Sequence, residues 1–386
     1  MTRDAPAQRL HGLGTTIFAE MSALALATGS VNLGQGFPDT DGPAEIADAA
    51  IAAIRAGHNQ YPPGPGIPDL RSAIAEHQHR FYSLPVDPGT EVVVTTGATE
   101  AIAAVLLGLV DPGDEVVALE PFYDSYAACI AMAGGRRVPV TLRAPDFRLD
   151  VERLRDAVTD RTRLILLNSP HNPTGTVLTR DELQAVADLA IERDVIVVTD
   201  EVYEHMTYGV QHIPLATLPG MHERTLTISS AGKTFSFTGW KVGWATGPKP
   251  LVQAVLTAKQ FLTFVSGAPF QPAVAAGLRL PDTYFSGLRD SLRLKRNRLC
   301  GGLRDVGFEV FEPAGTYFVT ADVRPLGYSD GVEFCRDLPQ RCGVVAIPHQ
   351  VFYDDVEAGK PLVRFAFCKR DEVLDEAIER LQKLRA

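Results

Sequence analysis

Two lysines in the segment SSAGKTFSFTGWKVGW (229–244) are the first candidates for chemistry. Lys233 follows an apolar run and stands among small and hydroxylic residues, and Lys241 lies eight positions further on. A lysine that is partly desolvated near a second cation has a lowered pKa, so its neutral amine can form a Schiff base with an aldehyde. For any single lysine, a place on the surface is the simpler interpretation, so the assignment depends on the other polar residues.

Polar residues also follow two other apolar runs. Asp200 ends VIVVTD, with Tyr203 three positions later, and Asn172 lies in the turn after LILLNSP. A carboxylate at such a place must be paired or hydrogen-bonded, because burying it alone costs several kcal/mol. Considered singly, Asp200 is explained equally well as a helix N-cap, and Asn172 as an Asx turn.

A fourth run, EVVVTT, ends in Gly97, Ala98 and Thr99, where a helical pattern begins. Small residues at a helix N-terminus expose backbone N–H groups that can bind phosphate, although many such turns are only tight turns. Pyridoxal 5'-phosphate requires an amine for its aldehyde, an anion beside its pyridine nitrogen, donors for its phenolic oxygen and a cradle for its phosphate. In that order, the chain offers Lys233, then Asp200, then Asn172 with Tyr203, and finally Gly97 to Thr99 with Ser230 and Lys241.

These residues need a scaffold that brings the ends of several strands together. Between about residues 90 and 250, apolar β-branched runs alternate with helical patterns, which predicts an α/β fold with a parallel sheet between helices. Ligands of such sheets bind at the carboxyl ends of the strands, where the polar residues lie. The Gly/Pro-rich stretches NLGQGFPDTDGP and NQYPPGPGIPDL predict irregular loops beside the site. We predict a large cofactor-binding domain over residues 45–285 and a smaller domain formed by residues 1–44 and 286–386.

The composition argues against several classes of protein. The chain has 386 residues, 45% of them apolar, and a formal net charge of −10, which disfavours nucleic acid and anionic membranes as partners. Its five cysteines form no C-x-x-C pair, which fits neither a disulfide framework nor a zinc ribbon. We find no signal peptide and no span long enough for a bilayer, so we expect a cytoplasmic protein.

The chain resembles the class I pyridoxal-phosphate aminotransferases of the aspartate-aminotransferase fold, also called fold type I. The motifs that carry the resemblance span nearly the whole chain: LGQGFPD, NQYPPGPGIPDLR, TTGATEA, EPFYDSY, NSPHNPTG, DEVYEH, SSAGKTFSFTGWKVGW, GTYF and VRFAF. Within this family, it is most similar to actinobacterial N-succinyldiaminopimelate aminotransferases and to the kynurenine, glutamine and methionine aminotransferase branch. The resemblance implies a large domain with a mostly parallel seven-stranded sheet and a smaller α+β domain.

The resemblance also implies a role for each candidate residue. Lys233 would bind the aldehyde of the cofactor and move the substrate proton, and Asp200 would pair with the pyridine nitrogen. Asn172 and Tyr203 would bind the phenolic oxygen, and Tyr123 would stack on the ring. The phosphate would be held by Gly97, Ala98, Thr99, Ser230, Lys241 and the neighbouring subunit's copy of Tyr61, which implies a homodimer with shared active sites. Many relatives have arginine where Lys241 stands, so here the phosphate keeps a charge but loses a two-donor fork.

The substrate would be bound by a further group of residues. Arg364 would bind the substrate carboxylate through its planar fork, with Gly36 allowing the backbone to approach the same group. Phe18, Asn172 and Tyr317 would lie beside the substrate. A structural ion pair is the alternative for Arg364, and plain core packing is the alternative for Phe18 and Tyr317.

The implied reaction exchanges an amino group between an L-amino acid and a 2-oxo acid, with ping-pong kinetics. We expect N-succinyl-2-amino-6-oxopimelate as acceptor and glutamate as donor. Kynurenine, aromatic, methionine, glutamine and unusual amino acids are the alternatives, and a cysteine-conjugate β-lyase would share the cofactor residues. A nicotinamide dehydrogenase is disfavoured because no G-x-G-x-x-G follows a strand.

Overall fold

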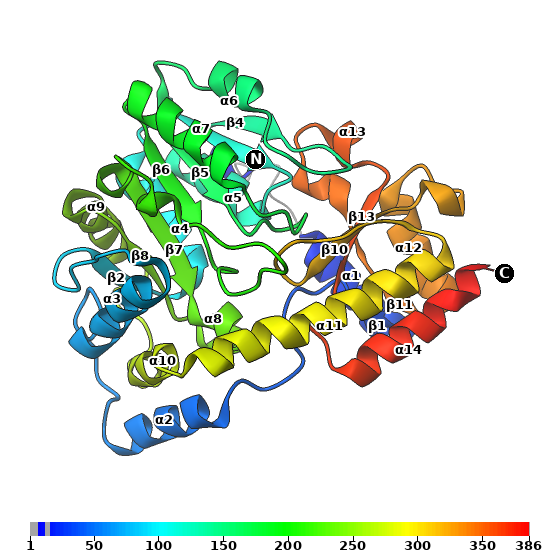
Figure 1. Ribbon diagram of the computed structural model, residues 1–386, viewed down its shortest axis with the longest axis horizontal. Coiled ribbons are helices and arrows are strands. Elements are labelled where there is room, and N and C mark those ends of the chain that lie inside the picture. Colours follow the sequence, from blue (N-terminus) through cyan, green and yellow to red (C-terminus); the bar gives the residue numbers. More distant parts are fainter. Residues whose placement is uncertain (1–6, 12–15, 386) are drawn as a thin grey trace, which may run out of the picture.

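The computed structural model describes residues 7–11 and 16–385. The larger of its main β-sheets has seven strands (Figure 1). The strands lie side by side in the order β2-β8-β7-β6-β5-β3-β4. β8 is antiparallel to both of its neighbours, β2 and β7, and the other six strands share one direction. The carboxyl ends of β2, β5, β6 and β7 therefore meet at one edge. The bounds are β2 Val92–Thr95, β3 Glu115–Glu120, β4 Arg136–Thr141, β5 Thr162–Asn168, β6 Ile196–Asp200, β7 Thr225–Ser230 and β8 Gly243–Thr246.

Helices cover both faces of this sheet because the strands are apolar on both sides. Along β3, Val116 and Ala118 belong to one buried cluster, while Val117 and Leu119 belong to another. The first face packs against α4 (Gly97–Leu109), α5 (Asp124–Ala133) and α9 (Lys249–Lys259). The second face packs against α6 (Val151–Ala157) and α7 (Arg180–Glu192) and, near β2 and β8, against α2 (Ala44–Arg55), α3 (Pro68–Tyr82) and α10 (Phe270–Leu278).

A second, antiparallel sheet of four strands is built from the C-terminal part of the chain, in the order β12-β13-β10-β9. Its helix α1 (Ile17–Thr28) comes from the N-terminal part and packs among these C-terminal elements (Figure 1). The remaining bounds are β1 Val31–Asn32, β9 Glu309–Phe311, β10 Phe318–Asp322, β11 Val344–Val345, β12 Ile347–Pro348, β13 Leu362–Ala366, α8 Ala231–Thr234, α12 Gly331–Cys342, α13 Val356–Gly359 and α14 Asp371–Leu381. Short 3₁₀ turns cover Gln8–Leu10, Leu215–Thr217, His222–Arg224, Thr238–Trp240, Arg324–Leu326, His349–Phe352 and Gln382–Arg385.

One long helix, α11 (Asp282–Val306), runs from the large sheet to the small one (Figure 1). Phe285 near its start belongs to the cluster under β2 and β8, and Leu299 and Leu303 near its end belong to the cluster of the small sheet. The predicted domain boundary at residue 285 falls inside this helix, so one helix contributes to both hydrophobic cores. The division into two domains therefore stays a prediction.

The five runs predicted as strands correspond to β2, β3, β5, β6 and β7. Two strands were not predicted. β4 is an edge strand in which only Val140 is buried and Pro139 lies in the middle, and β8 is only four residues long and begins with a glycine. The Gly/Pro-rich stretch around residues 59–70 is a loop up to residue 67, and α3 begins at Pro68. No helix among the described residues is long and apolar enough to cross a membrane.

Candidate active site

A cavity of about 330 Å³ lies at the carboxyl edge of the large sheet, and Phe318 and Arg364 of the small sheet form part of its wall. Every residue predicted for the site lines this cavity except Tyr61 and Tyr317. The predicted residues that do so are Phe18, Gly36, Gly97, Ala98, Thr99, Tyr123, Asn172, Asp200, Tyr203, Ser230, Lys233, Lys241 and Arg364.

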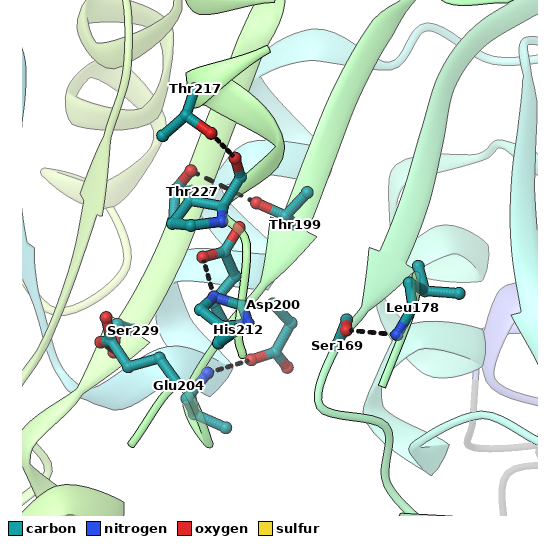
Figure 2. Close-up of polar contacts among 12 residues, drawn as sticks. Ser169, Leu178, Thr199, Asp200, Glu204, His212, Thr217, Thr227 and Ser229 are labelled. Atoms are coloured by element: carbon teal, nitrogen blue, oxygen red, sulfur yellow. Dashed lines mark hydrogen bonds and ion pairs between the residues drawn. The ribbon is translucent and has the colours of Figure 1, made fainter. Parts of the chain in front are cut away.

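Asp200, the last residue of β6, is one of the residues that line the cavity, and Figure 2 shows its side chain beside the strand end. Its carboxylate accepts a hydrogen bond of 2.6 Å from the hydroxyl of Tyr126, and its side chain forms no salt bridge among the described residues. Burial raises the pKa of Asp200 to about 6, and the Tyr126 hydrogen bond opposes this shift. The carboxylate is therefore ionised at neutral pH and available for a cation above it.

Asn168 ends the neighbouring strand β5 and connects Asp200 to Asn172. Its position is set by the parallel register, which pairs Asn168 with Asp200. The Asn168 amide donates to the carbonyl of Asp200 at 2.7 Å, and its oxygen accepts from the backbone N–H of Asn172 at 2.7 Å. The amide therefore fixes the turn that carries Asn172 relative to the carboxylate.

Lys233 enters the cavity from the short helix α8, which follows β7 directly. Its amine donates to the hydroxyl of Tyr317 at 3.0 Å, and that hydroxyl donates to the carbonyl of Gly36 at 2.7 Å. Burial lowers the pKa of Lys233 to about 8, and the charges of Arg364 and Lys241 act in the same direction. At pH 7 about a tenth of the amine is therefore neutral, which is far more than for an ordinary lysine, and this neutral form can act as a nucleophile or general base.

The opposite end of the cavity is a cradle formed by the start of α4 and by Lys241. The Lys241 amine lies 3.4 Å from the hydroxyl of Thr99. Gly97 has φ +72°, and a Cβ at that position would lie 3.0 Å from the Lys241 amine. A side chain there would therefore crowd the cation and fill the space in front of the helix N-terminus, which glycine keeps open for an anion.

Arg364 projects from the middle of β13 and is only 2% exposed. Its guanidinium donates to the side-chain oxygen of Asn172 at 2.9 Å and to the carbonyl of Gly34 at 3.0 Å, whereas its Nε is buried without a hydrogen-bond partner. The guanidinium carbon lies 4.0 Å from the ring centre of Phe318 and 5.2 Å from that of Phe18. Burial lowers the pKa of Arg364 to about 10, so it remains a cation at neutral pH.

Two predicted residues are placed differently from the rest. Tyr317 is fully buried and contacts Lys233 rather than the open cavity. Tyr61 is 80% exposed, outside the cavity, and its ring meets the ring of Phe264 edge-on at 5.3 Å. Gly36 lines the cavity, but a Cβ there would lie 2.6 Å from the Phe318 ring, so its missing side chain also makes room for the aromatic ring beside Arg364.

Several residues of the site were missed from the sequence. Asn168 could have been found, because it ends an apolar strand just as Asp200 does. Tyr126 is three positions after Tyr123 on the same motif, but nothing in the sequence shows that its hydroxyl reaches Asp200. The other lining residues are Gln35, Phe37, Ile102, Val202, Gly232, Thr238, Val242 and Phe318. All except Ile102 lie inside the motifs that carry the resemblance, but their residue types did not single them out as site residues.

These observations fit pyridoxal phosphate. A lysine amine with a lowered pKa, a buried carboxylate without a salt bridge and an open helix N-terminus with a second lysine beside it all face one cavity. A model of the family "Aminotransferase class I and II" matches residues 28–381. The chain belongs to the class I and II aminotransferases. This aminotransferase therefore depends on pyridoxal phosphate, as the sequence predicted.

The aminotransferase is similar to relatives over nearly its whole length. It is 55% identical to a probable N-succinyldiaminopimelate aminotransferase (DapC) of Mycobacterium tuberculosis, over 97% of this chain and 98% of the relative. It is 40% identical to a methionine aminotransferase of Escherichia coli, over 98% of each chain. The solved structure of the Mycobacterium tuberculosis N-succinyldiaminopimelate aminotransferase superposes with a TM-score of 0.96 at 56% identity, covering 98% of this chain and 100% of that one. The predicted fold type is thereby confirmed.

Proposed function

We propose that this aminotransferase transfers an amino group from glutamate to N-succinyl-2-amino-6-oxopimelate, a step of lysine biosynthesis. The observation that carries this proposal is the 55% identity to a relative named for that activity, over 97% of the chain. This identity exceeds the 40% and 39% shared with relatives named for methionine and kynurenine.

One feature of the cavity favours a second candidate. Among the described lining residues, the only lysines and arginines are Lys233, Lys241 and Arg364, and the cofactor and one substrate carboxylate use all three. The rest of the wall includes the rings of Phe18, Phe37 and Phe318. Such a wall suits an uncharged apolar side chain, such as those of methionine, kynurenine or aromatic amino acids, whereas an acylated acceptor with further carboxylates needs donors from outside this set.

The residues act on the substrate in the following way. When bound, pyridoxal phosphate withdraws electrons and stabilises negative charge at the substrate α-carbon. Lys233, with its pKa lowered by burial, removes the proton from that carbon, and Tyr317 holds its amine in position. Arg364 binds the α-carboxylate, and the hydrogen bond from Arg364 to Asn172 keeps both side chains aligned.

The same proposal assigns the cofactor contacts. Asp200 would pair with the pyridine nitrogen, and Asn172 and Tyr203 would bind the phenolic oxygen. Tyr123 would stack on the ring. The phosphate would be held by Gly97, Ala98, Thr99, Ser230 and Lys241 and by the partner subunit's Tyr61.

A spectroscopic experiment tests the function. The purified protein with added pyridoxal phosphate is expected to absorb in the near-visible range, and this band should decrease with glutamate and return with the correct acceptor. kcat/KM is then compared for N-succinyl-2-amino-6-oxopimelate and for the 2-oxo acids of methionine, kynurenine and phenylalanine. A higher value for one of the latter would replace the proposed acceptor, and pyruvate release from a cysteine conjugate without an acceptor would identify a β-lyase.

Replacement of Arg364 with lysine is expected to raise KM about 10- to 100-fold for every amino acid donor. Lysine keeps the charge but loses the two-donor fork, and a hydrogen bond to a charged group contributes about 1.5–3 kcal/mol. Steady-state kinetics with glutamate and methionine measure the effect, and Arg336→Lys, at an exposed site, is the matched control. Unchanged KM for both donors would show that Arg364 does not bind the carboxylate.

We further propose that the chain acts as a homodimer. Tyr61 lies near a group of exposed apolar side chains, since Phe261 is 83%, Phe264 52% and Leu262 46% exposed. Large exposed apolar groups of this kind are typical of protein–protein interfaces. In such a dimer, Tyr61 would reach the phosphate of the partner's site, which accounts for its position outside the cavity of its own chain.

Mixing two inactive variants tests the shared site. Lys233→Ala chains and Tyr61→Ala chains, dissociated and reassembled together in equal amounts, are expected to regain about one quarter of the wild-type activity, because about half of the dimers are hybrids and one of the two sites in each hybrid is intact. A mixture in which the second chain carries both substitutions is the control and should stay inactive. If the single-variant mixture also stays inactive, Tyr61 does not act across the dimer.

Two further proposals concern the organisation and location of the chain. We propose the division into a large domain of residues 45–285 and a small domain of residues 1–44 and 286–386, joined through α11. We also propose that the protein acts in the cytoplasm, which the five buried cysteines support because none of them forms a disulfide.

A further inference from the structure

Behind the active site lies a buried cluster of three potential metal ligands, His77, Glu204 and His205. His77 comes from α3, whereas Glu204 and His205 lie in the loop that follows β6 and Asp200. One ligand atom from each of the three lies within 4.8 Å of the others. His77 is 2% exposed and Glu204 is 4% exposed, while His205 is half-buried. This cluster is separate from the residues that line the active-site cavity.

Two atoms of the cluster are buried without a hydrogen-bond partner. One carboxylate oxygen of Glu204 accepts from the hydroxyl of Ser229 at 2.7 Å (Figure 2), and its Oε2 has no partner within hydrogen-bond geometry. Burial and the nearby Glu204 carboxylate raise the pKa of Tyr82, whose hydroxyl is therefore the side-chain donor that competes with a metal ion for this carboxylate. The Nδ1 of His77 also has none. Among the described residues, Glu204 forms no salt bridge. A buried carboxylate oxygen without a partner is costly, so a ligand that satisfies it is expected.

The rings of His77 and His205 approach each other closely, with their Nε2 atoms 2.7 Å apart. A hydrogen bond between the two imidazoles explains this distance but leaves the Glu204 oxygen without a partner. A metal ion between the three side chains would bind the Nε2 atoms of both rings and the carboxylate oxygen, while the Nδ1 of His77 would stay without a partner. Ligands of tetrahedral zinc at about 2.0–2.2 Å lie roughly 3.3 Å from one another, so the nitrogens would separate by about half an ångström and the carboxylate would move inward by up to about 1.5 Å.

We propose that His77, Glu204 and His205 bind a divalent transition-metal ion of the zinc type. Two imidazoles and one carboxylate are a ligand set that zinc accepts, and a fourth position would be filled by water. The ion would tie α3 to the loop that carries Tyr203. Through Ser229, it would also tie this loop to β7, whose last residue, Ser230, lines the cofactor cavity.

A second cavity gives the ion a route to the cluster. It has a volume of about 580 Å³, and Glu204, His205 and His212 belong to its wall. The Nδ1 of His212 is buried without a partner, and its Nε2 contacts Glu201 at 2.7 Å (Figure 2). The same wall includes Phe81 and Phe285, whose rings pack against His205 and restrict its orientation.

The test uses the holoenzyme without a polyhistidine tag, purified without chelators. Its metal content is measured by mass spectrometry, and after removal of bound metal it is titrated with Co²⁺, whose visible bands report coordination. Glu204→Gln keeps the shape and the Ser229 contact but removes the charge, and His205→Gln removes one half-buried ligand. The control is His58→Gln, which removes an exposed imidazole outside the cluster.

We expect about one metal ion per chain in the wild type and in His58→Gln. Both cluster variants should bind Co²⁺ at least about 10-fold more weakly while keeping the near-visible cofactor band, which shows that they fold. Trace metal and no saturable Co²⁺ band in the wild type would overturn the proposal and leave a hydrogen-bonded histidine pair. Saturable binding that neither cluster variant weakens would overturn it as well, because the metal would then lie elsewhere.

Discussion

Replacing Lys233 with alanine is expected to abolish the near-visible absorbance of the bound cofactor and to lower kcat/KM by at least about 10⁴-fold. Among the described residues, two lysines line the cavity, Lys233 and Lys241. Lys241 belongs to the phosphate end, so Lys233 supplies the amine beside Asp200 and Tyr203. Its removal takes away both the covalent attachment of the cofactor and the group that moves the substrate proton. General acid–base catalysis alone contributes about 10²–10⁴-fold.

Three measurements separate this role from a structural one. Absorbance spectra with added pyridoxal phosphate report the attachment, single-turnover rates with glutamate report proton transfer, and thermal unfolding reports stability. Lys249→Ala, at an exposed position, is the matched control and should behave as the wild type. A Lys233→Ala protein that kept the wild-type band would show that another amine binds the cofactor, and the proposed site would then be wrong.

The site residues that could be predicted are those whose neighbours in the sequence show that they lie at the end of a buried strand. Asp200 stands out because a carboxylate ends an otherwise apolar strand, and Lys233 because the same pattern recurs one strand later. The parallel register then brings such strand ends to one edge, which is why separate motifs converge. Five of the seven strands follow from the same runs, whereas β4 and β8 do not, and only the resemblance implied a sheet of seven strands.

The remaining features depend on contacts between segments far apart in the chain. Tyr317 was expected near the substrate, yet its hydroxyl lies between Lys233 and the Gly36 carbonyl, which only the packing of the small sheet determines. Tyr126 reaches Asp200 across 74 positions. Arg364 was predicted only through the resemblance, because an arginine within a strand pattern has no local signal that distinguishes it from a surface ion pair.

Replacing Asp200 with asparagine is expected to lower kcat/KM for glutamate by about 10²–10⁴-fold and to weaken cofactor binding. Asparagine keeps the shape of the side chain but removes the charge opposite the pyridine nitrogen. Breaking one partner of a buried charge pair costs about 3–5 kcal/mol, which corresponds to this range of rate. The control Asp194→Asn removes an exposed carboxylate and should leave both quantities unchanged.

Tyr126→Phe provides a graded comparison for the same carboxylate. It removes the 2.6 Å hydrogen bond to Asp200 but leaves the charge in place, so the loss of kcat/KM should be about 10- to 100-fold and smaller than that of Asp200→Asn. The hydrogen bond lowers the pKa of Asp200 and burial raises it, so Tyr126→Phe should also move the acidic limb of the pH–rate profile to higher pH. A threefold change in kcat/KM corresponds to less than about 1 kcal/mol. If Asp200→Asn retains kcat/KM within about threefold of the wild type, the charge of Asp200 does not activate the cofactor.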